Sequence, residues 1–201
     1  KFRGVNRHDS NPYTGAAVTR EDVIRDLQLM KESNVNAIRT SHYPNAPYFP
    51  ELCSEYGFYM IAEADLESHG VGTLYTNDGH DCMGYIAQDD AWVESILDRQ
   101  KRNVIRDKNQ SAVIFWSLGN ESGYGGNFED AGRWVKAYDS TRLLHYEASI
   151  YDSAGYHNDV SMLDVMSRMY ADTEWVKEYC EDRRMRKPFI QCEFIHAMGN
   201  G

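Results

Sequence analysis

Short apolar runs alternate with amphipathic stretches along the whole chain. The runs are rich in β-branched and aromatic residues and end at turn-forming residues, a pattern typical of buried strands. We expect seven strands, at residues 2–6, 35–39, 58–62, 112–118, 143–146, 165–169 and 189–193. The stretches between them place apolar residues at helical spacing. We expect helices after the N-cap residue Thr19 and over residues 46–56, 90–106, 128–138 and 173–180.

Strands that alternate with helices over the whole chain predict a parallel sheet with right-handed crossovers. The predicted fold class is α/β, a (β/α)8 TIM barrel that is truncated after its seventh strand. At 201 residues the chain suffices for one α/β domain but is shorter than the roughly 250 residues typical of a complete barrel. The alternative, an open doubly wound sheet, would usually carry a glycine-rich phosphate loop after its first strand, and the sequence has none there.

Residues 70–89 interrupt the alternation. They are rich in Gly, Asp, Asn and Thr and show little periodicity, which is typical of loops. We therefore expect a long loop at the carboxyl end of the predicted barrel.

Composition and charge argue against several classes of function. The formal net charge of −10 and the isoelectric point near 5.1 disfavour nucleic-acid binding, which requires a basic face. No apolar run approaches the roughly 20 residues of a membrane span, so we expect no membrane partner. The four cysteines are scattered, without a Cys-x-x-Cys pair. This pattern predicts buried free thiols and favours a cytoplasmic location.

Two glutamates each stand where a predicted strand ends. Glu121 follows the run at residues 113–118, and Glu193 closes the run at residues 189–193. The carboxyl ends of parallel strands meet at the mouth of a barrel, where catalytic residues collect. Two carboxylates at one mouth can serve as acid/base and nucleophile in glycoside hydrolysis. In the alternative interpretation, Glu121 is a strand-end residue that caps the next helix.

Glu193 has apolar residues on both sides, and a buried unpaired carboxylate is costly. We therefore expect Glu193 to be paired, and an arginine such as Arg39 would hold it ionised, as a nucleophile requires. An acid/base partner needs the opposite surroundings, because burial or a like charge must favour its protonated form.

Further polar side chains follow other predicted strands. Glu67 and His69 offer oxygen and imidazole ligands compatible with Mg²⁺ or Mn²⁺; in the alternative interpretation they are two surface loop residues. Three histidines and a tyrosine also stand after strands: His8, His42, His196 and Tyr170. The hydroxyl of Tyr170 would bond to a nucleophile, unless the residue is an aromatic rim residue. A zinc protease and an α/β-hydrolase are disfavoured, because neither His-Glu-x-x-His nor Gly-x-Ser-x-Gly occurs.

Five segments together resemble glycoside hydrolase family 2, close to the bacterial lactose-cleaving enzymes of that family. They are residues 3–8 (RGVNRH), 39–45 (RTSHYPN), 67–70 (ESHG), 116–123 (WSLGNESG) and 192–200 (CEFIHAMGN). Their order and their spread along the chain make the resemblance specific. The sequence departs from the family at Asp65, where the family has Asn, and at Phe194, where it has Tyr. Neither is a proton-transfer position.

The resemblance implies a retaining hydrolase that cleaves terminal non-reducing β-D-galactosides, such as lactose, by double displacement. It implies that Glu121 is the acid/base and that Glu193 is the nucleophile, assisted by Tyr170. It also implies an active-site Mg²⁺, or Mn²⁺, held by Glu67, His69 and Glu121. The sugar or the transition state would be contacted by the remaining polar residues: Asn120 (at the 2-hydroxyl), His42, His196, His8 and Arg39.

The resemblance further implies that residues 1–201 are a partial catalytic barrel from a larger multidomain enzyme, which we expect to be a homo-oligomer. The chain starts at Lys1 without an initiator Met, and we read it as the middle of a longer protein. An unclosed barrel exposes two strand edges, so we expect the chain by itself to have weak or no activity.

Three other functions remain open at this point. Within the family, a β-glucuronidase or a β-mannosidase would use the same two carboxylates. A barrel that binds sugar without cleaving it would usually have lost one of them, and both are present. A metal-dependent hydrolase of non-sugar substrates would use Glu67, His69 and Glu121.

Overall fold

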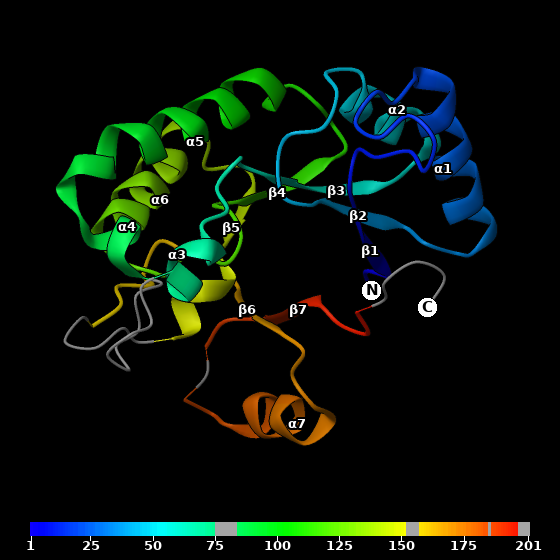
Figure 1. Cartoon of the computed structure of the whole chain (residues 1–201). Coiled ribbons are helices and arrows are strands. Elements are labelled where there is room, and N and C mark those ends of the chain that lie inside the picture. Colours follow the sequence, from blue (N-terminus) through cyan, green and yellow to red (C-terminus); the bar gives the residue numbers. More distant parts are fainter. Residues whose placement is uncertain (75–83, 152–156, 185, 197–201) are drawn as a thin grey trace.

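A parallel sheet forms the centre of the molecule (Figure 1). The computed structural model describes residues 1–74, 84–151, 157–184 and 186–196. The larger sheet has the order β1-β2-β3-β4-β5, and each neighbouring pair is parallel. Its strands are β1 (Gly4–Arg7), β2 (Ala37–Thr40), β3 (Tyr59–Glu63), β4 (Val113–Ser117) and β5 (Leu143–His145). The predicted α/β class and parallel sheet are confirmed.

The last two strands form a separate parallel pair, β6 (Met166–Met169) and β7 (Phe189–Glu193). Between β5 and β6 the chain turns through the 3₁₀-helix η4 (Glu147–Ile150), and no ladder joins β5 to β6 in the described part of the chain. Single contacts link the two sheets instead. The amide of Asp164 donates to the Leu144 carbonyl at 2.9 Å, and the amide of Met169 donates to Oε1 of Glu147 at 3.2 Å. All seven predicted strands are present, with ends within two residues of those expected.

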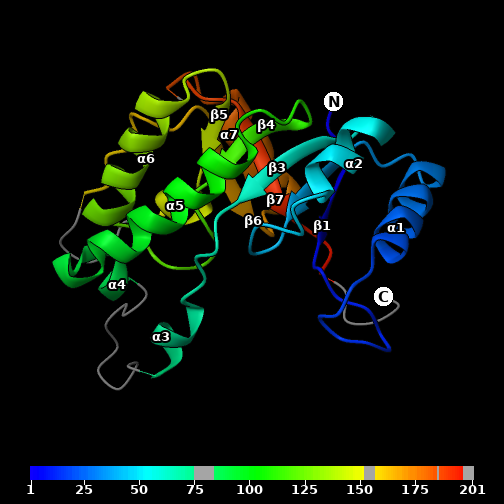
Figure 2. The same cartoon turned by 90° about the horizontal axis from the view of Figure 1, so that it is seen from above.

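Helices cover the outer face of the larger sheet. In Figure 2, α1 (Arg20–Glu32) and α2 (Phe49–Tyr56) lie at the right of the view, toward β1 and β2. The helices α5 (Val93–Asp107) and α6 (Gly126–Tyr138) lie at the left, toward β4 and β5. Thr19 begins α1 as predicted: its hydroxyl accepts the amide of Asp22, whose carboxylate accepts the amide of Thr19. The helix α7 (Thr173–Glu181) lies apart, beside β6 and β7 (Figure 1).

The prediction of one long loop at residues 70–89 was wrong for the residues that the structure describes. Two short helices occur there, α3 (His69–Leu74) and α4 (Tyr85–Gln88), and the 3₁₀-helix η3 (Asp90–Trp92) leads into α5. Helices of one or two turns are too short to repeat an apolar stripe, so periodicity does not detect them. Residues 75–83 lie outside the described part of the chain.

The two faces of each strand have different partners, because successive side chains point to opposite sides. On the helix side, Ile38, Met60 and Trp116 belong to the main core, together with Phe49, Leu52, Phe128 and Leu144. On the inner side, a smaller apolar layer contains Ile61, Phe115 and Val165. Above that layer, toward the carboxyl ends of the strands, the buried side chains are polar: Arg39, Glu63, Ser117, His145 and Ser167. The fold thus delivers a buried polar cluster directly beneath the strand ends.

A groove separates the first strand from the last. A cavity of about 980 Å³ lies between β1 and β7, with Val5, Ile38 and Ile190 among its walls. The side-chain amide of Asn6 donates to the Cys192 carbonyl across it at 3.1 Å. No ladder connects β1 with β7 among the described residues. No helix of that part of the chain is long and apolar enough to cross a membrane.

Candidate active site

Glu193 stands at the carboxyl end of β7, and each of its carboxylate oxygens has a partner. Nη1 of Arg39 donates to Oε1 at 2.8 Å, and the hydroxyl of Tyr170 donates to Oε2 at 2.6 Å. Arg39 comes from β2, and Tyr170 directly follows β6. The structure therefore pairs Glu193 with Arg39, as the sequence predicted. Because the hydroxyl of Tyr170 donates to this carboxylate, the pKa of Tyr170 is raised to about 12.

Arg39 is the centre of the buried cluster, with 3% of its surface exposed. Its Nε donates to Oε2 of Glu63 at 2.6 Å, and its Nη2 donates to Oδ1 of Asn120 at 2.8 Å. Burial alone would lower the pKa of Arg39, but Glu63 and the other nearby anions outweigh burial and raise it. The guanidinium therefore joins the ends of three strands, because it bonds to β3, β7 and the segment after β4.

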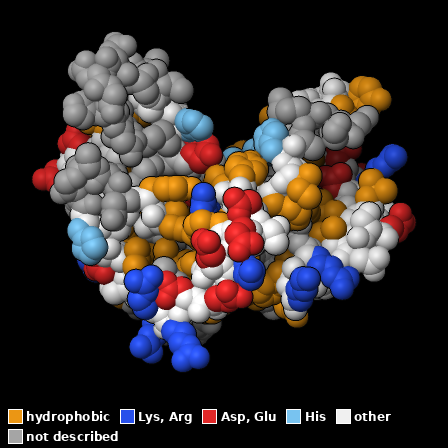
Figure 3. All heavy atoms as spheres, turned by 90° about the horizontal axis from the view of Figure 1, so that it is seen from below, with side chains coloured by type: hydrophobic (Ala, Val, Ile, Leu, Met, Phe, Trp, Pro, Cys, Tyr) orange, Lys and Arg blue, Asp and Glu red, His pale blue; other side chains and the backbone are white. Residues whose placement is uncertain are grey.

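Histidines lie around Glu193. Nδ1 of His42 is 2.7 Å from Oε1 of Glu63, and Nε2 of His42 is 3.7 Å from Oε1 of Glu193. His8 stacks edge-on against His42, with 5.3 Å between ring centres, and burial together with the charge of His42 lowers the pKa of His8. Nδ1 of His196 is 3.4 Å from the Tyr170 hydroxyl. Figure 3, which views the molecule from below, shows histidine side chains on both sides of the hollow at the top of the picture.

Glu121 lies in a second cluster, with Glu67 and His69. Nδ1 of His69 contacts Oε2 of Glu121, and the amide of His69 donates to Oε1 of Glu67 at 3.0 Å. One ligand atom from each of the three residues lies within 4.8 Å of the others. Burial, together with the charge of Glu121, raises the pKa of Glu67. The predicted metal-ligating residues are thus brought together, with oxygen and imidazole donors on one open side.

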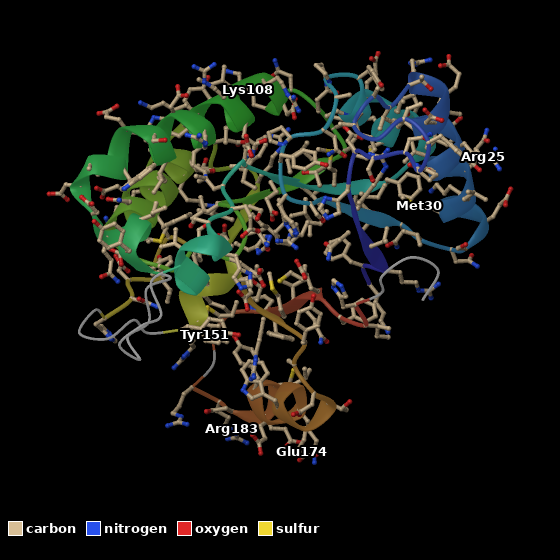
Figure 4. All side chains as sticks on the ribbon, in the orientation of Figure 1. Arg25, Met30, Lys108, Tyr151, Glu174 and Arg183 are labelled. Carbon is tan, nitrogen blue, oxygen red and sulfur yellow. The ribbon has the colours of Figure 1, made fainter. Side chains whose placement is uncertain are left out.

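Asn120 connects the two clusters. Its Oδ1 accepts from Arg39, and its Nδ2 donates to Oε2 of Glu67. The backbone amide of Asn120 donates to the Leu66 carbonyl at 2.8 Å, which fixes the loop after β4 against the loop after β3. The side chains of Glu193 and Glu121 therefore lie on one connected polar network. Figure 4 shows polar side chains in the space between the two sheets, whereas Glu174 on α7 and the nearby Arg183 lie away from it.

The backbone is unusual where these side chains are displayed. Glu121 has φ of 32° and Tyr170 has φ of 50°, in the left-handed region that residues other than glycine rarely adopt. Gly119 has φ of 143°, and a Cβ at this position would lie 2.8 Å from both Cβ and the carbonyl oxygen of Leu66. Such conformations persist where the surrounding structure enforces them, and they cluster at functional sites.

Among the buried titratable residues that the sequence analysis missed, three interact with residues of the site: Glu63, His145 and Glu147. Glu63 is fully buried; burial opposes its charge, but Arg39, His42 and Ser117 hold its pKa below the usual value. Glu147, at the start of η4, has a pKa raised by burial, and burial lowers the pKa of His145 to about 4. One signal was available for Glu63, because it ends an apolar run just as Glu193 does.

A parallel α/β fold with paired strand-end carboxylates is the arrangement expected of a glycoside hydrolase. A sequence model of the glycosyl hydrolases family 2, TIM barrel domain, matches residues 1–201. The chain belongs to this family.

Curated relatives and solved structures agree with this assignment. The chain is 51% identical to a β-galactosidase of Actinobacillus pleuropneumoniae, with 100% of this chain and 22% of that protein covered. It is 45% identical to a β-galactosidase of Staphylococcus xylosus, with 100% and 20% covered. The structure is similar to a β-D-glucuronidase from Dictyoglomus thermophilum, with a TM-score of 0.77, 22% identity, and 99% of this chain and 37% of that chain covered. At that identity the likeness shows the fold alone. The chain spans about a fifth of the length of these curated relatives.

Proposed function

We propose that the chain carries the catalytic residues of a retaining β-galactosidase, which cleaves terminal non-reducing β-D-galactosides such as lactose. The observation that carries the proposal is the environment of Glu193, whose oxygens bond to Arg39 and Tyr170 on the same network as Glu121. The curated relatives named above, which are called β-galactosidases, support the choice of sugar.

In the first step, Glu193 attacks the anomeric carbon while Glu121 gives its proton to the glycosidic oxygen. The bond to the leaving group breaks as the glycosyl–Glu193 ester forms, through an oxocarbenium-like transition state. In the second step, Glu121 takes a proton from water, the water oxygen bonds to the anomeric carbon, and Glu193 leaves as a carboxylate. This scheme requires the two carboxyl groups to be about 5–5.5 Å apart.

The residues around Glu193 suit this scheme. The guanidinium of Arg39 holds one oxygen of the attacking carboxylate through a charge-assisted hydrogen bond of 2.8 Å. Tyr170 orients the second oxygen of the same carboxylate. Asn120 would bind the sugar's 2-hydroxyl. The other polar residues around the two glutamates would contact further hydroxyls or the transition state: Arg39, His8, His42 and His196.

The second cluster supports a divalent cation at Glu67, His69 and Glu121. Two carboxylates and one imidazole, with solvent access for water ligands, fit Mg²⁺ or Mn²⁺. When bound, such an ion would supply positive charge that stabilises the carboxylate of Glu121 once its proton has been given up. The side chains themselves are already oriented by protein contacts, because Asn120 and the amide of His69 hold Glu67.

The groove between β1 and β7 supports the proposal that residues 1–201 form a partial catalytic barrel. We place one further strand at the cavity of about 980 Å³ between these two, whose walls include apolar side chains of β1, β2 and β7 as well as Glu193 and Tyr170. An eighth strand, contributed by a larger multidomain polypeptide, would pair with both edges and complete the barrel. The share of the relatives' length that the chain covers is consistent with this arrangement.

Covalent trapping tests the proposal. The polypeptide at its natural length is incubated with a 2-deoxy-2-fluoro-β-galactosyl donor that has a good leaving group, and the labelled peptide is identified by mass spectrometry. We expect a stable galactosyl adduct on Glu193. Matched glucuronosyl and mannosyl donors are the controls, and preferential labelling by one of them would assign the site to a different sugar. A folded protein that labels with none of the three would contradict the retaining mechanism.

A further inference from the structure

Glu63 ends β3 beneath the strand ends, and none of its surface is exposed. Its Oε1 lies 2.7 Å from Nδ1 of His42. Its Oε2 accepts from Nε of Arg39 and from the Ser117 hydroxyl, each at 2.6 Å. The amide of Glu63 also donates to the Thr40 hydroxyl at 3.0 Å, so the backbone of this residue is tied to β2. Both carboxylate oxygens are therefore directed at side chains of the site.

Two partners of Glu63, Arg39 and His42, also lie next to one oxygen of Glu193. Nη1 of Arg39 donates to Oε1 of Glu193 at 2.8 Å, and Nε2 of His42 is 3.7 Å from the same oxygen. Glu63 thus contacts Nε of Arg39 and Nδ1 of His42, whereas Nη1 and Nε2 of the same two side chains face Oε1 of Glu193. Arg39 lies on β2, whereas His42 lies two residues past the end of that strand.

We propose that Glu63 is a positioning residue that holds Arg39 and His42 as one unit against Oε1 of Glu193. The inference rests on the proposed role of Glu193 as nucleophile. A guanidinium is planar, so bonds from Nε to Glu63 and from Nη2 to Asn120 determine where Nη1 points. In the same way, a bond from Nδ1–H of His42 to Glu63 fixes the tilt of the imidazole and directs Nε2 toward Glu193.

Glu63 also sets the local charge. Arg39 forms ion pairs with both Glu63 and Glu193, so its positive charge is balanced by two carboxylates and not by Glu193 alone. Charged and titratable groups act on Glu63 from five directions in the described part of the chain: His8 after β1, Arg39 on β2, His42 after β2, His145 from β5 and Cys192 from β7. The net effect of its surroundings is to keep the pKa of Glu63 low, so Glu63 remains an anion while the reaction proceeds.

A graded set of variants in the polypeptide at its natural length tests the proposal. Glu63→Gln keeps the shape but removes the charge and one acceptor, Glu63→Asp keeps the charge but shortens the reach, and Ser117→Ala removes one donor to Oε2. Asp139→Asn is the matched control. Asp139 is also a buried carboxylate, and it accepts from Trp116, Thr141 and Arg142 on the helix side of β4.

The readout is the labelling of Glu193 by the fluoro-galactosyl donor, followed over time by mass spectrometry. The final fraction of labelled protein (the labelling amplitude) measures how many sites are correctly folded. The first-order rate constant for labelling at saturating donor reports how well the nucleophile is positioned. We expect Glu63→Gln to lower the rate constant about 100-fold, since a misplacement of about 1 Å can cost that much. Glu63→Asp should lose roughly 10-fold and Ser117→Ala roughly threefold, with amplitudes near that of the parent. Asp139→Asn should keep the parental rate constant.

Two results would overturn the role of Glu63. One is a set of Glu63 variants that lose amplitude but label at the parental rate, which indicates a purely structural residue. The other is an equal loss of rate constant in Asp139→Asn. If Glu63→Gln does not fold, Glu63→Asp and Ser117→Ala decide by the same criterion. A parent that labels at Glu193 only with a different sugar revises the proposed substrate, and the variants are then compared with that donor. A parent that labels with no donor contradicts both the proposed function and this role.

Discussion

The carboxylates of Glu193 and Glu121 lie at the same end of the fold but in opposite surroundings. The Glu193 side chain is 13% exposed, and its Arg39 partner is 2% exposed. The Glu121 side chain is 31% exposed, and its His69 partner is 57% exposed. The Glu193 carboxylate is held by the buried Arg39 of β2 and by the hydroxyl of Tyr170, which follows β6, whereas Glu121 projects from a glycine-flanked loop toward solvent.

This difference matches the two roles that we propose. A nucleophile has to be held in a fixed position, and a buried arginine and a tyrosine hydroxyl bind one oxygen each of Glu193. An acid/base has to lose and regain a proton in every cycle, and Glu121 is open to water and shares its cluster with the like-charged Glu67. The comparison teaches that the environment, rather than the residue type, divides the work between two glutamates. This division of roles can be tested by substituting each glutamate and its partners in turn.

The largest effect is expected from Glu193→Ala. Without the nucleophile the covalent step cannot occur, and turnover of an aryl β-galactoside should fall by at least about 10⁴-fold. Azide can then enter from the vacated face, so the rescued product should be the α-galactosyl azide. Steady-state kinetics and NMR of the product check both points. A β-galactosyl azide from this variant would reverse the assignment of the two glutamates.

A loss of about 10² to 10⁴-fold is expected from Glu121→Gln, because proton transfer in the transition state contributes that much. The loss should depend on the leaving group. A dinitrophenyl galactoside leaves without protonation and should be affected least in its first step, whereas lactose should be affected most. Initial rates on both substrates measure this difference. Equal losses on the two substrates would argue against Glu121 as the acid.

Removal of divalent cations with a chelator should lower activity by about 10 to 100-fold, and Mg²⁺ or Mn²⁺ should restore it. The apparent metal affinity should fall as the pH decreases, because protons compete for the ligands and the pKa of Glu67 is raised. Titration calorimetry across pH 5–8 measures this dependence. Glu67→Gln should weaken metal binding and leave labelling of Glu193 at saturating metal detectable. An affinity that is constant over that range would exclude these ligands.

Tyr170→Phe should lower the turnover number by about 10 to 100-fold, since a hydrogen bond to a charged group contributes about 1.5–3 kcal/mol. The substitution leaves the ring in place and removes only the donor to Oε2 of Glu193. We expect the rate constant for labelling of Glu193 to fall while the labelling amplitude stays unchanged. Tyr179→Phe is a control, because that hydroxyl donates to the carbonyl of Lys187, which precedes β7, whereas Glu193 stands at the other end of the strand.

The smallest effect concerns stability alone. The pKa of Asp139 is lowered to about 2 by hydrogen bonds from Thr141, Trp116 and Arg142, which outweigh burial. A lowered pKa in the folded state contributes stability above the ordinary value of 3.8, and this contribution is lost as the pH falls toward about 2. Asp139→Asn should therefore lower the melting temperature by a few degrees at pH 7 and flatten its decline below pH 4. Calorimetry checks both trends. A steeper acid decline in the variant would contradict them.

The sequence was sufficient for the features that depend on local pattern. Strand 189–193 was predicted with the bounds that the structure has, because an apolar run between turn residues marks a strand clearly. The pairing of Arg39 with Glu193 followed from the cost of a buried lone carboxylate. The pattern alone suggested Glu67 and His69 as a pair, and the resemblance to family 2 implied that Glu121 joins them.

Other features depend on three-dimensional proximity and could not be predicted in this way. Glu63 has the same sequence signature as Glu193, but only the register of β2, β3 and β4 shows that it receives Arg39, His42 and Ser117. The break between β5 and β6 coincides with η4, whose single turn leaves no periodic signal. The left-handed backbone of Glu121 and Tyr170 has no sequence marker, because neither residue favours it.

The distance along the chain between Arg39 and Glu193, 154 residues, has a consequence for synthesis on the ribosome. At about 5–20 residues per second, Glu193 is added about 8 to 31 s after Arg39. Glu63 follows Arg39 by only 24 residues and is therefore available within about 1 to 5 s. During the rest of that interval the guanidinium already has one carboxylate at hand. The nascent β1–β4 segment can therefore bury its arginine before the residue proposed to perform the chemistry exists.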